Sequence, residues 1–191
     1  MGDSGTVVFP TDTYYALGCS AVCSDAVSRI YRLKSREANR PLLILIDSWR
    51  MFHEYVDSIP AIQLRTVEKH WPGSLTAIFK TNRKLARELN CQSDEVAIRM
   101  TPHPVALELI SICGVPLVGT SANRSGRPPV TNVEAAIRCF SAKVDLYIDG
   151  GETEGGLPST VIRFLKGGGI QTVRKGAVSV SAHKRGTQIK T

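Results

Sequence analysis

Apolar residues recur along this chain in two spacings, one typical of buried strands and one typical of amphipathic helices. Residues 42–46 and 115–118 are short, continuous aliphatic runs, so they predict strands buried in a sheet. Within residues 25–33 and 104–113, apolar positions fall three and four residues apart. This spacing predicts helices that each bury one face.

The same two patterns extend over the rest of the chain. Further strands are predicted at residues 5–9, 75–80, 95–100, 144–148, 160–164 and 170–174, and further helices at residues 48–56, 60–69 and 132–140. Ser24 is the expected N-cap of the helix at 25–33, and Gly114 is expected to end the helix at 104–113. The alternation of helices and strands predicts an α/β fold. Hairpin-like connections late in the chain predict a mixed sheet rather than an all-parallel one.

Length and composition set the broad class of the protein. A chain of 191 residues fits one domain, or one domain with a tail. With 42% apolar and 21% charged residues it has the composition of a soluble globular protein, and no apolar run approaches the roughly 20 residues of a membrane span. Its first residues do not resemble a signal peptide, so we expect a cytoplasmic location and no membrane partner. The five cysteines lack a paired metal-ligand spacing, which favours reduced thiols and predicts no metal ligands.

The net charge is the second global property that bears on function. A formal charge of +7 and an isoelectric point near 9.3 favour anionic partners, either nucleotide phosphates or RNA, although a basic protein can also carry such charge for solubility alone. Part of the excess lies near the C-terminus. We therefore predict a folded domain over residues 1–178 and a basic, mobile tail over residues 179–191.

A hydroxyl-rich and basic loop follows the predicted strand at 115–118. It opens at Gly119 and runs over residues 120–127, with Ser121 and Asn123 among its polar side chains. Such a loop can present hydroxyls, an amide and backbone N–H groups to an anion, and open α/β sheets bind ligands at strand ends. The same residue types are ordinary turn formers, so the loop alone leaves both interpretations open.

Other polar side chains lie where a purely structural role is hard to assign. Thr13 follows the first predicted strand, and Ser159 follows a glycine-rich turn. Lys34 and Arg36 both can reach one phosphate chain from the end of the first helix, although cations also favourably cap a helix C-terminus. Arg99 lies within an apolar strand, where it either faces solvent or, from a cleft, holds a carboxylate through two hydrogen bonds.

Short motifs along the chain resemble those of a known family. In their order and spacing, FPTDT, KSR, WPGSLT, VAIRM, VPLVGTSAN, DGG and GLPSTV resemble the YrdC-type threonylcarbamoyl-AMP synthases, from about Gly5 to Val178. The resemblance implies a single-domain, YrdC-like α/β fold in which a twisted mixed sheet is wrapped by helices around a basic central cavity. It also implies synthesis of L-threonylcarbamoyl-AMP from L-threonine, bicarbonate or CO2, and ATP, with release of pyrophosphate.

The resemblance further implies roles for nine residues. It assigns L-threonine binding to Thr13, Arg99, Gly119 and Ser159. It assigns catalysis and the ATP phosphates to Lys34, Arg36, Ser121 and Asn123, with Arg174 also at the nucleotide. Mg2+ would enter with ATP and be held mainly by the phosphates. The implied partners are a downstream threonylcarbamoyl-transferase complex that modifies the tRNA adenosine beside the anticodon, and tRNA or double-stranded RNA.

The implied chemistry suits these residue types. The amine of threonine attacks CO2 to give a carbamate, whose oxygen then attacks the α-phosphate. Because both reactants of the second step are anionic, cations such as Lys34 and Arg36 must offset their repulsion, and Ser121 and Asn123 add neutral donors. No side chain is predicted as a general base, and the four histidines fall outside the motifs.

Two other classes of function remain open from the sequence. A non-catalytic relative could use the basic surface to bind RNA or assist ribosome maturation, but this role does not need the full set of donors described above. A carbamoyl-transfer module of hydrogenase maturation could share the fold. Such modules belong to long chains with zinc-finger cysteines, a pattern that this sequence lacks.

Overall fold

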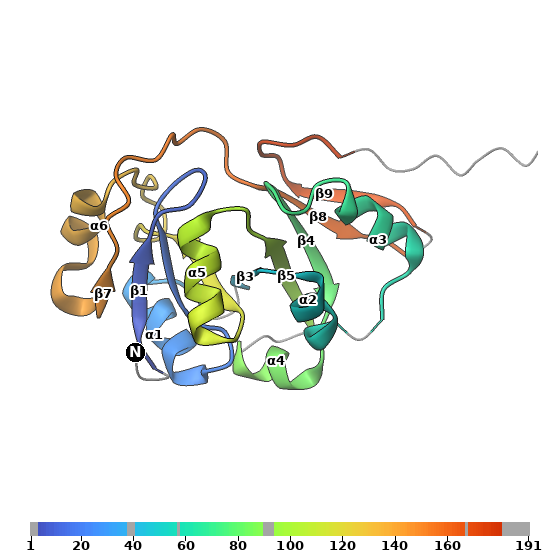
Figure 1. The fold of residues 1–191 in the computed structure, drawn as a ribbon, viewed down its shortest axis with the longest axis horizontal. Helices are drawn as coiled ribbons and strands as arrows, with labels where there is room; N and C mark the ends of the chain where they lie inside the picture. The colour runs from blue at the N-terminus through green and yellow to red at the C-terminus, as the bar shows by residue number, and fades with distance from the viewer. Residues whose placement is uncertain (1–3, 38–40, 57, 90–93, 167, 181–191) are drawn as a thin grey trace, which may run out of the picture.

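A mixed β-sheet forms the centre of the computed structural model, which describes residues 4–37, 41–56, 58–89, 94–166 and 168–180 (Figure 1). The strands are β1 (Thr6–Phe9), β2 (Ala16–Ser20), β3 (Leu43–Ile46), β4 (Leu75–Lys80), β5 (Glu95–Met100), β6 (Leu117–Ser121), β7 (Leu146–Tyr147), β8 (Thr160–Phe164) and β9 (Ile170–Arg174). The helices are α1 (Ser24–Lys34), α2 (Trp49–Tyr55), α3 (Ala61–Glu68), α4 (Arg83–Glu88), α5 (Pro104–Cys113), α6 (Val133–Phe140) and the short 3-10 helix η1 (Ser141–Lys143).

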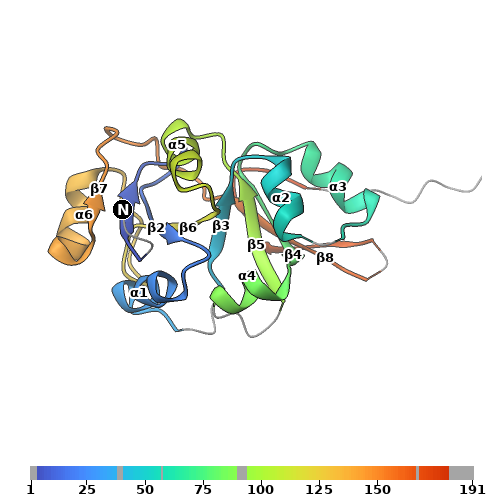
Figure 2. The same cartoon turned by 60° about the horizontal axis from the view of Figure 1, so that its bottom comes forward.

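The strand order within this sheet is β7-β1-β2-β6-β3-β5-β4-β8-β9. Three strand pairs are parallel (β1 with β7, β3 with β5, β4 with β8) and the others are antiparallel, so the predicted α/β fold with a mixed sheet is confirmed. The helices surround the sheet, as the rotated view in Figure 2 shows. The fold therefore places segments far apart in sequence, such as β2 and β6, side by side.

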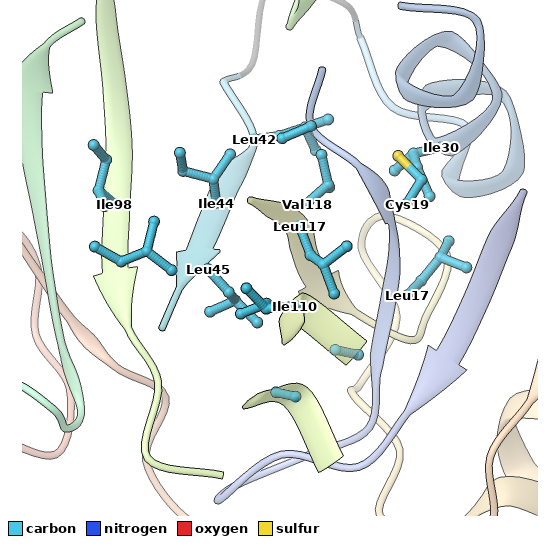
Figure 3. Close-up of a cluster of buried hydrophobic side chains, with 14 of the residues drawn as sticks. Leu17, Cys19, Ile30, Leu42, Ile44, Leu45, Ile98, Ile110, Leu117 and Val118 are labelled. Carbon is cyan, nitrogen blue, oxygen red and sulfur yellow. The ribbon is translucent and has the colours of Figure 1, made fainter. Parts of the chain in front are cut away.

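Side chains alternate across the central strands, and the two faces of the sheet differ accordingly. Ile44, Ile98 and Val118 lie at paired positions of β3, β5 and β6, and all three are fully buried (Figure 3). Leu45, the neighbour of Ile44 in sequence, points to the other face and lines a cavity there. One face of the central strands thus lies in the hydrophobic core, and the other, on which Leu45 is also buried, contributes to the wall of a cavity.

Most predicted elements are present, with three differences. The strand expected at 115–118 begins at Leu117 and continues to Ser121, because β2 lies alongside and pairs with residues up to Ser121. Three elements without a predicted counterpart, β2, α4 and the short 3-10 helix η1, also form. The predicted Ser24 N-cap is wrong: Ser24 is the first helical residue, and the N-cap Cys23 makes no side-chain capping hydrogen bond. Gly114 ends α5 as expected, with a φ of 67° that favours glycine.

Three features at the margins of the fold bear on the sequence predictions. The cysteines among the described residues are free thiols. In the part of the chain that the structure describes, no helix has the length and apolar character needed to cross a membrane. Most of the predicted tail, residues 181–191, lies outside the described residues, while Val178 and Val180 pack against the core.

Candidate active site

A cavity of about 720 Å3 lies on the open face of the central strands. Its walls come from β3, β5, β4, β6, β8 and β9 and from the loop between β1 and β2. Seven of the nine residues predicted for the site line this cavity: Thr13, Arg36, Arg99, Gly119, Ser121, Ser159 and Arg174. The two others, Lys34 and Asn123, are not among the lining residues. The structure therefore brings together segments that the sequence separates by up to 161 positions (174 − 13).

Arg99 projects from β5 and is held in place by the loop after β1. Its Nη2 donates to both carboxylate oxygens of Asp12, at 2.7 and 2.6 Å, and its Nε donates to the backbone oxygen of Gly73 at 2.8 Å. Burial alone would raise the pKa of Asp12, but the charge and hydrogen bonds of Arg99, aided by Ser74, hold it below its usual value. Arg99 makes no hydrogen bond through Nη1 to any described residue, so that nitrogen remains available to a ligand carboxylate.

Arg174 and Ser159 form a second polar group on the cavity wall. Arg174 donates from Nε and Nη2 to the backbone oxygen of Ser159, at 3.2 and 2.9 Å, and from Nη2 to its hydroxyl at 3.0 Å. The Ser159 hydroxyl is also 2.9 Å from that of Thr76 on β4. Arg99 and Arg174 line the same cavity, and burial together with the positive charge of Arg99 lowers the pKa of Arg174. A shared anion would relieve this repulsion.

Lys34 lies behind the loop that follows β6 rather than inside the cavity. Its Nζ donates to the backbone oxygens of Ser121 and Asn123, the latter at 2.7 Å, and to Oδ1 of Asn123 at 3.3 Å. Three acceptors match the three donors of an ammonium group. Burial lowers the pKa of Lys34 to about 8, with a further contribution from the charge of Arg36, so the charged form still predominates at neutral pH. In this arrangement the ammonium group of Lys34 supports the loop after β6, a role that was not considered from sequence.

Asn123 completes the support of the loop. Its Oδ1 also accepts from the hydroxyl of Ser121 at 2.5 Å, and its Nδ2 donates to the backbone oxygen of Arg127. Asn123 is buried, whereas Ser121 is exposed to the cavity. Lys34 and Asn123 thus fix the loop from behind, and Ser121 is the member of this group that a ligand can touch.

The remaining predicted residues occupy different parts of the wall. Arg36 lines the cavity, and its Nη2 donates to the backbone oxygen of Pro41 at 3.0 Å. Thr13 is also a lining residue, and its backbone oxygen accepts from Gly155 N at 2.8 Å. At Gly119, a Cβ atom would lie 2.7 Å from Cδ1 of Leu45. A side chain at this position would therefore force Leu45, a lining residue, to shift.

The electrostatic character of the cavity is set by three arginines. Arg36, Arg99 and Arg174 line it, and no carboxylate does so among the described residues. Within the same part of the chain, no group of three or more His, Cys, Asp and Glu side chains is arranged to hold a metal ion. The cavity is therefore suited to an anionic ligand of small-molecule size.

Sequence reasoning missed two residues next to Arg99. Asp12 belongs to the FPTDT segment, but its pairing with Arg99 joins positions 87 residues apart. His103 lies near both: burial lowers its pKa, the charge of Arg99 adds to this effect, and Asp12 opposes it. Its buried Nδ1 has no hydrogen-bond partner among the described residues. The motif containing Asp12 was a usable signal, whereas nothing in the local sequence marks His103.

The fold and the arginine-lined cavity define an α/β protein with a binding site for small anionic molecules. A family model described as "Telomere recombination" (Sua5, YciO and YrdC) matches residues 1–176. The chain belongs to this family. It is 38% identical over 156 residues to the threonylcarbamoyl-AMP synthase of Pyrococcus abyssi, covering 82% of this chain and 46% of that protein. It is 34% identical over 150 residues to the threonylcarbamoyl-AMP synthase of Halorhodospira halophila, covering 78% of each.

Solved structures of the family have the same fold. Sua5 of P. abyssi complexed with L-threonine superposes with a TM-score of 0.84 at 36% identity, covering 91% of this chain and 51% of that one. YciO of E. coli superposes with a TM-score of 0.81 at 26% identity, covering 92% and 85%. The chain spans about half the length of the relatives from P. abyssi and Bacillus subtilis, at 46% and 51%.

Proposed function

We propose that this chain synthesises L-threonylcarbamoyl-AMP from L-threonine, bicarbonate or CO2, and ATP, and releases pyrophosphate. The observation that carries the proposal is a single cavity in which Arg99 and Thr13 lie with Arg36, Ser121 and Arg174. Arg99 and Thr13 suit an amino acid, and Arg36, Ser121 and Arg174 suit a phosphate chain. Relatives named threonylcarbamoyl-AMP synthase, and a related structure complexed with L-threonine, support this assignment.

The threonine end of the cavity is built around Arg99. Because Asp12 occupies Nη2 and Gly73 occupies Nε, the guanidinium is fixed in orientation before any ligand arrives. Its Nη1 would donate to the threonine carboxylate, with the Thr13 and Ser159 hydroxyls in the same cavity wall. The neutral amine then attacks the carbon of CO2, forming the C–N bond of a carbamate and releasing one of its two N–H protons to solvent.

The second step joins two anions. A carbamate oxygen attacks the α-phosphorus of ATP, the new P–O bond forms, and the bond to pyrophosphate breaks. Arg36 and Arg174 offset the repulsion between the reactants, and the Ser121 hydroxyl supplies a neutral donor. Lys34 and Asn123 act through the loop: they hold Ser121 in position rather than contacting the phosphates.

Mg2+ belongs to the proposal as a companion of ATP. The phosphates of ATP would supply most of the ligands of Mg2+, because the described lining of the cavity contributes arginines and hydroxyls and no carboxylate. Delivery of the product to tRNA through a threonylcarbamoyl-transferase complex, and contact with tRNA or double-stranded RNA, are also part of the proposal. The basic charge of the chain suits such partners.

The test is an assay of pyrophosphate release by the purified chain. We expect release to require L-threonine and bicarbonate together with ATP, and to fall sharply in Arg99→Lys. Arg65→Lys is the matched control, because Arg65 is exposed on α3 and is not a lining residue. Equal pyrophosphate release without threonine would leave a general ATP-hydrolysing protein in place of the synthase.

A further inference from the structure

A second cavity, of about 470 Å3, lies at the end of the molecule where α1 and α6 are found (Figures 1 and 2). Three segments form it: the C-terminal part of α1, the loop after β6, and the end of α6 with η1. Its lining residues are Arg29, Arg32, Leu33, Ser35, Arg124, Cys139, Phe140 and Lys143. None of these residues lines the substrate cavity, so the two cavities are distinct.

One of its four cations is already neutralised. Arg29 donates from Nη1 and Nη2 to the two carboxylate oxygens of Asp145, at 2.6 and 2.9 Å, and to the backbone oxygen of Lys143 at 2.7 Å. The N–H of Thr6, followed by the hydrogen bonds of Arg29, lowers the pKa of Asp145 to about 2. Asp145 is thus charged at neutral pH, but its oxygens are committed to Arg29 and Thr6.

The other three cations have no carboxylate partner. Arg32, Arg124 and Lys143 are exposed, and within the described chain none of them forms an ion pair or a side-chain hydrogen bond. They come from three different segments and meet around one hollow that no carboxylate lines among the described residues. The C-terminus of α1 would disfavour an anion, but two carbonyls of its last turn, those of Tyr31 and Arg32, accept hydrogen bonds from the N–H groups of Arg36 and Ser35.

The shape of this cavity favours a small ligand over an extended one. Leu33 and Phe140 form apolar walls, so the charges surround a concave space rather than a flat strip. Its volume is within the range of small-molecule sites. An extended polyanion instead follows charges spread over a surface.

The loop after β6 separates this cavity from the substrate cavity. Ser121 lines the substrate cavity, and Arg124, three residues on, lines the second one. Between them, Lys34 donates to the loop from one side, and its own backbone oxygen accepts from Ser125 N at 3.0 Å. Both faces of one loop are thus presented to separate basic cavities.

We propose that the second cavity is an additional anion-binding site for a small phosphate-bearing molecule, held by Arg32, Arg124 and Lys143. Guanidinium groups bind phosphate oxygens through paired hydrogen bonds, and the ammonium adds a point charge. The site is independent of the reaction proposed above, because it uses none of the residues of that cavity.

Two-dimensional NMR with pyrophosphate as the probe tests this proposal without measuring activity. We expect saturable shifts of the Ser35, Arg124 and Lys143 amides, separate from any shifts at Gly119 in the substrate cavity. In Arg32→Glu, the dissociation constant for pyrophosphate that the first set of shifts reports should rise by about tenfold or more, the scale of losing one charged hydrogen bond. Arg138→Glu is the control, because Arg138 is exposed on α6 and lies outside the cavity lining.

Each outcome decides the matter. Saturable shifts that Arg32→Glu weakens and Arg138→Glu preserves support the site. The absence of saturable shifts at these amides, or equal weakening in both variants, overturns it. If a duplex RNA shifts the same amides and pyrophosphate does not, the cavity is part of a nucleic-acid surface and the small-anion site is wrong. If the chain releases no pyrophosphate in the assay but shows these saturable amide shifts, only the proposed reaction is refuted.

Discussion

The ammonium group of Lys34 donates to both the backbone oxygen and the side-chain oxygen of Asn123, at 2.7 and 3.3 Å. This contact joins the end of α1 to the loop after β6, across 89 positions of sequence. Because the side chains of both residues are buried, the contact is protected from solvent screening. It makes the position of the loop, and of Ser121 on it, dependent on the protonation of one lysine.

The titration of Lys34 should be visible in the stability of the protein. Its pKa is about 8 in the folded chain and near 10.4 in an unfolded one. Between these values the unfolded state binds more protons, so the free energy of unfolding of the wild type should rise with pH relative to Lys34→Met. The full difference is at most about 3 kcal/mol. Denaturant unfolding of both proteins at pH 7.5 and pH 10.5 measures it.

Well below pH 8 the lysine is protonated in both states, so the two proteins should show parallel pH dependence there. When the free energy of unfolding of one protein is subtracted from that of the other, the contributions of titrating groups that the substitution does not affect cancel. If the free energy of unfolding of the wild type does not rise relative to that of Lys34→Met above pH 8, the three oxygen acceptors keep the pKa of Lys34 near its ordinary value.

Ser121 and Asn123 should respond differently to replacement by alanine. Ser121 is exposed to the cavity, so Ser121→Ala should lower turnover by about one to three decades with little change in melting temperature. Asn123 is buried and bonded to Lys34, Ser121 and Arg127, so Asn123→Ala should also destabilise the fold by about 1–3 kcal/mol. Steady-state kinetics and thermal melts on both variants separate the two effects. If Asn123→Ala melts at the same temperature as Ser121→Ala, Asn123 has the purely catalytic role expected from sequence.

The fold was predictable from sequence wherever a pattern was long enough to be specific. The strands at 75–80 and 95–100 and the helix at 104–113 have the expected bounds because each carries a full apolar period. The strand β2, with the sequence ALGCS, is short and made mostly of small residues, so it gives no such period. It forms because β1 and β6 provide hydrogen-bond partners on both sides.

The site was predictable as a set of residues but not as a set of contacts. Seven of the nine residues that the motifs named line one cavity. The motifs could not show that Lys34 donates to the backbone of the loop after β6, because this depends on how that loop packs against the end of α1. The same limit applies to Asp12, whose partner Arg99 lies on a distant strand.

Arg99→Lys should weaken threonine binding selectively. Lysine keeps the charge but loses the fork that holds Asp12 and Gly73 while offering Nη1 to a ligand. The expected loss is roughly 1.5–3 kcal/mol, the value of a hydrogen bond to a charged group. ATP affinity should change little. Calorimetric titration of each ligand into both proteins checks this, and parallel losses for the two ligands would indicate a general electrostatic effect or a damaged fold.

Gly119→Ala should damage the cavity wall through one identifiable neighbour. The added Cβ would lie 2.7 Å from Cδ1 and 2.8 Å from Cγ of Leu45, a side chain that is itself buried. Overpacking of this kind costs about 1–3 kcal/mol, and the displaced Leu45 would narrow the threonine side of the cavity. We therefore expect lower stability together with weaker threonine binding.

A double-mutant cycle with Leu45→Ala identifies the cause of that damage. Leu45→Ala alone should cost about 2–5 kcal/mol, because it removes a buried side chain. If the clash is with Leu45, the double variant should be more stable than the sum of the two single losses predicts, by about 0.5–3 kcal/mol. Strict additivity would mean that the strand backbone, rather than Leu45, excludes a side chain at position 119. Chemical denaturation of the four proteins provides the measurement, and threonine titration of the double variant shows whether relieving the clash also restores the site.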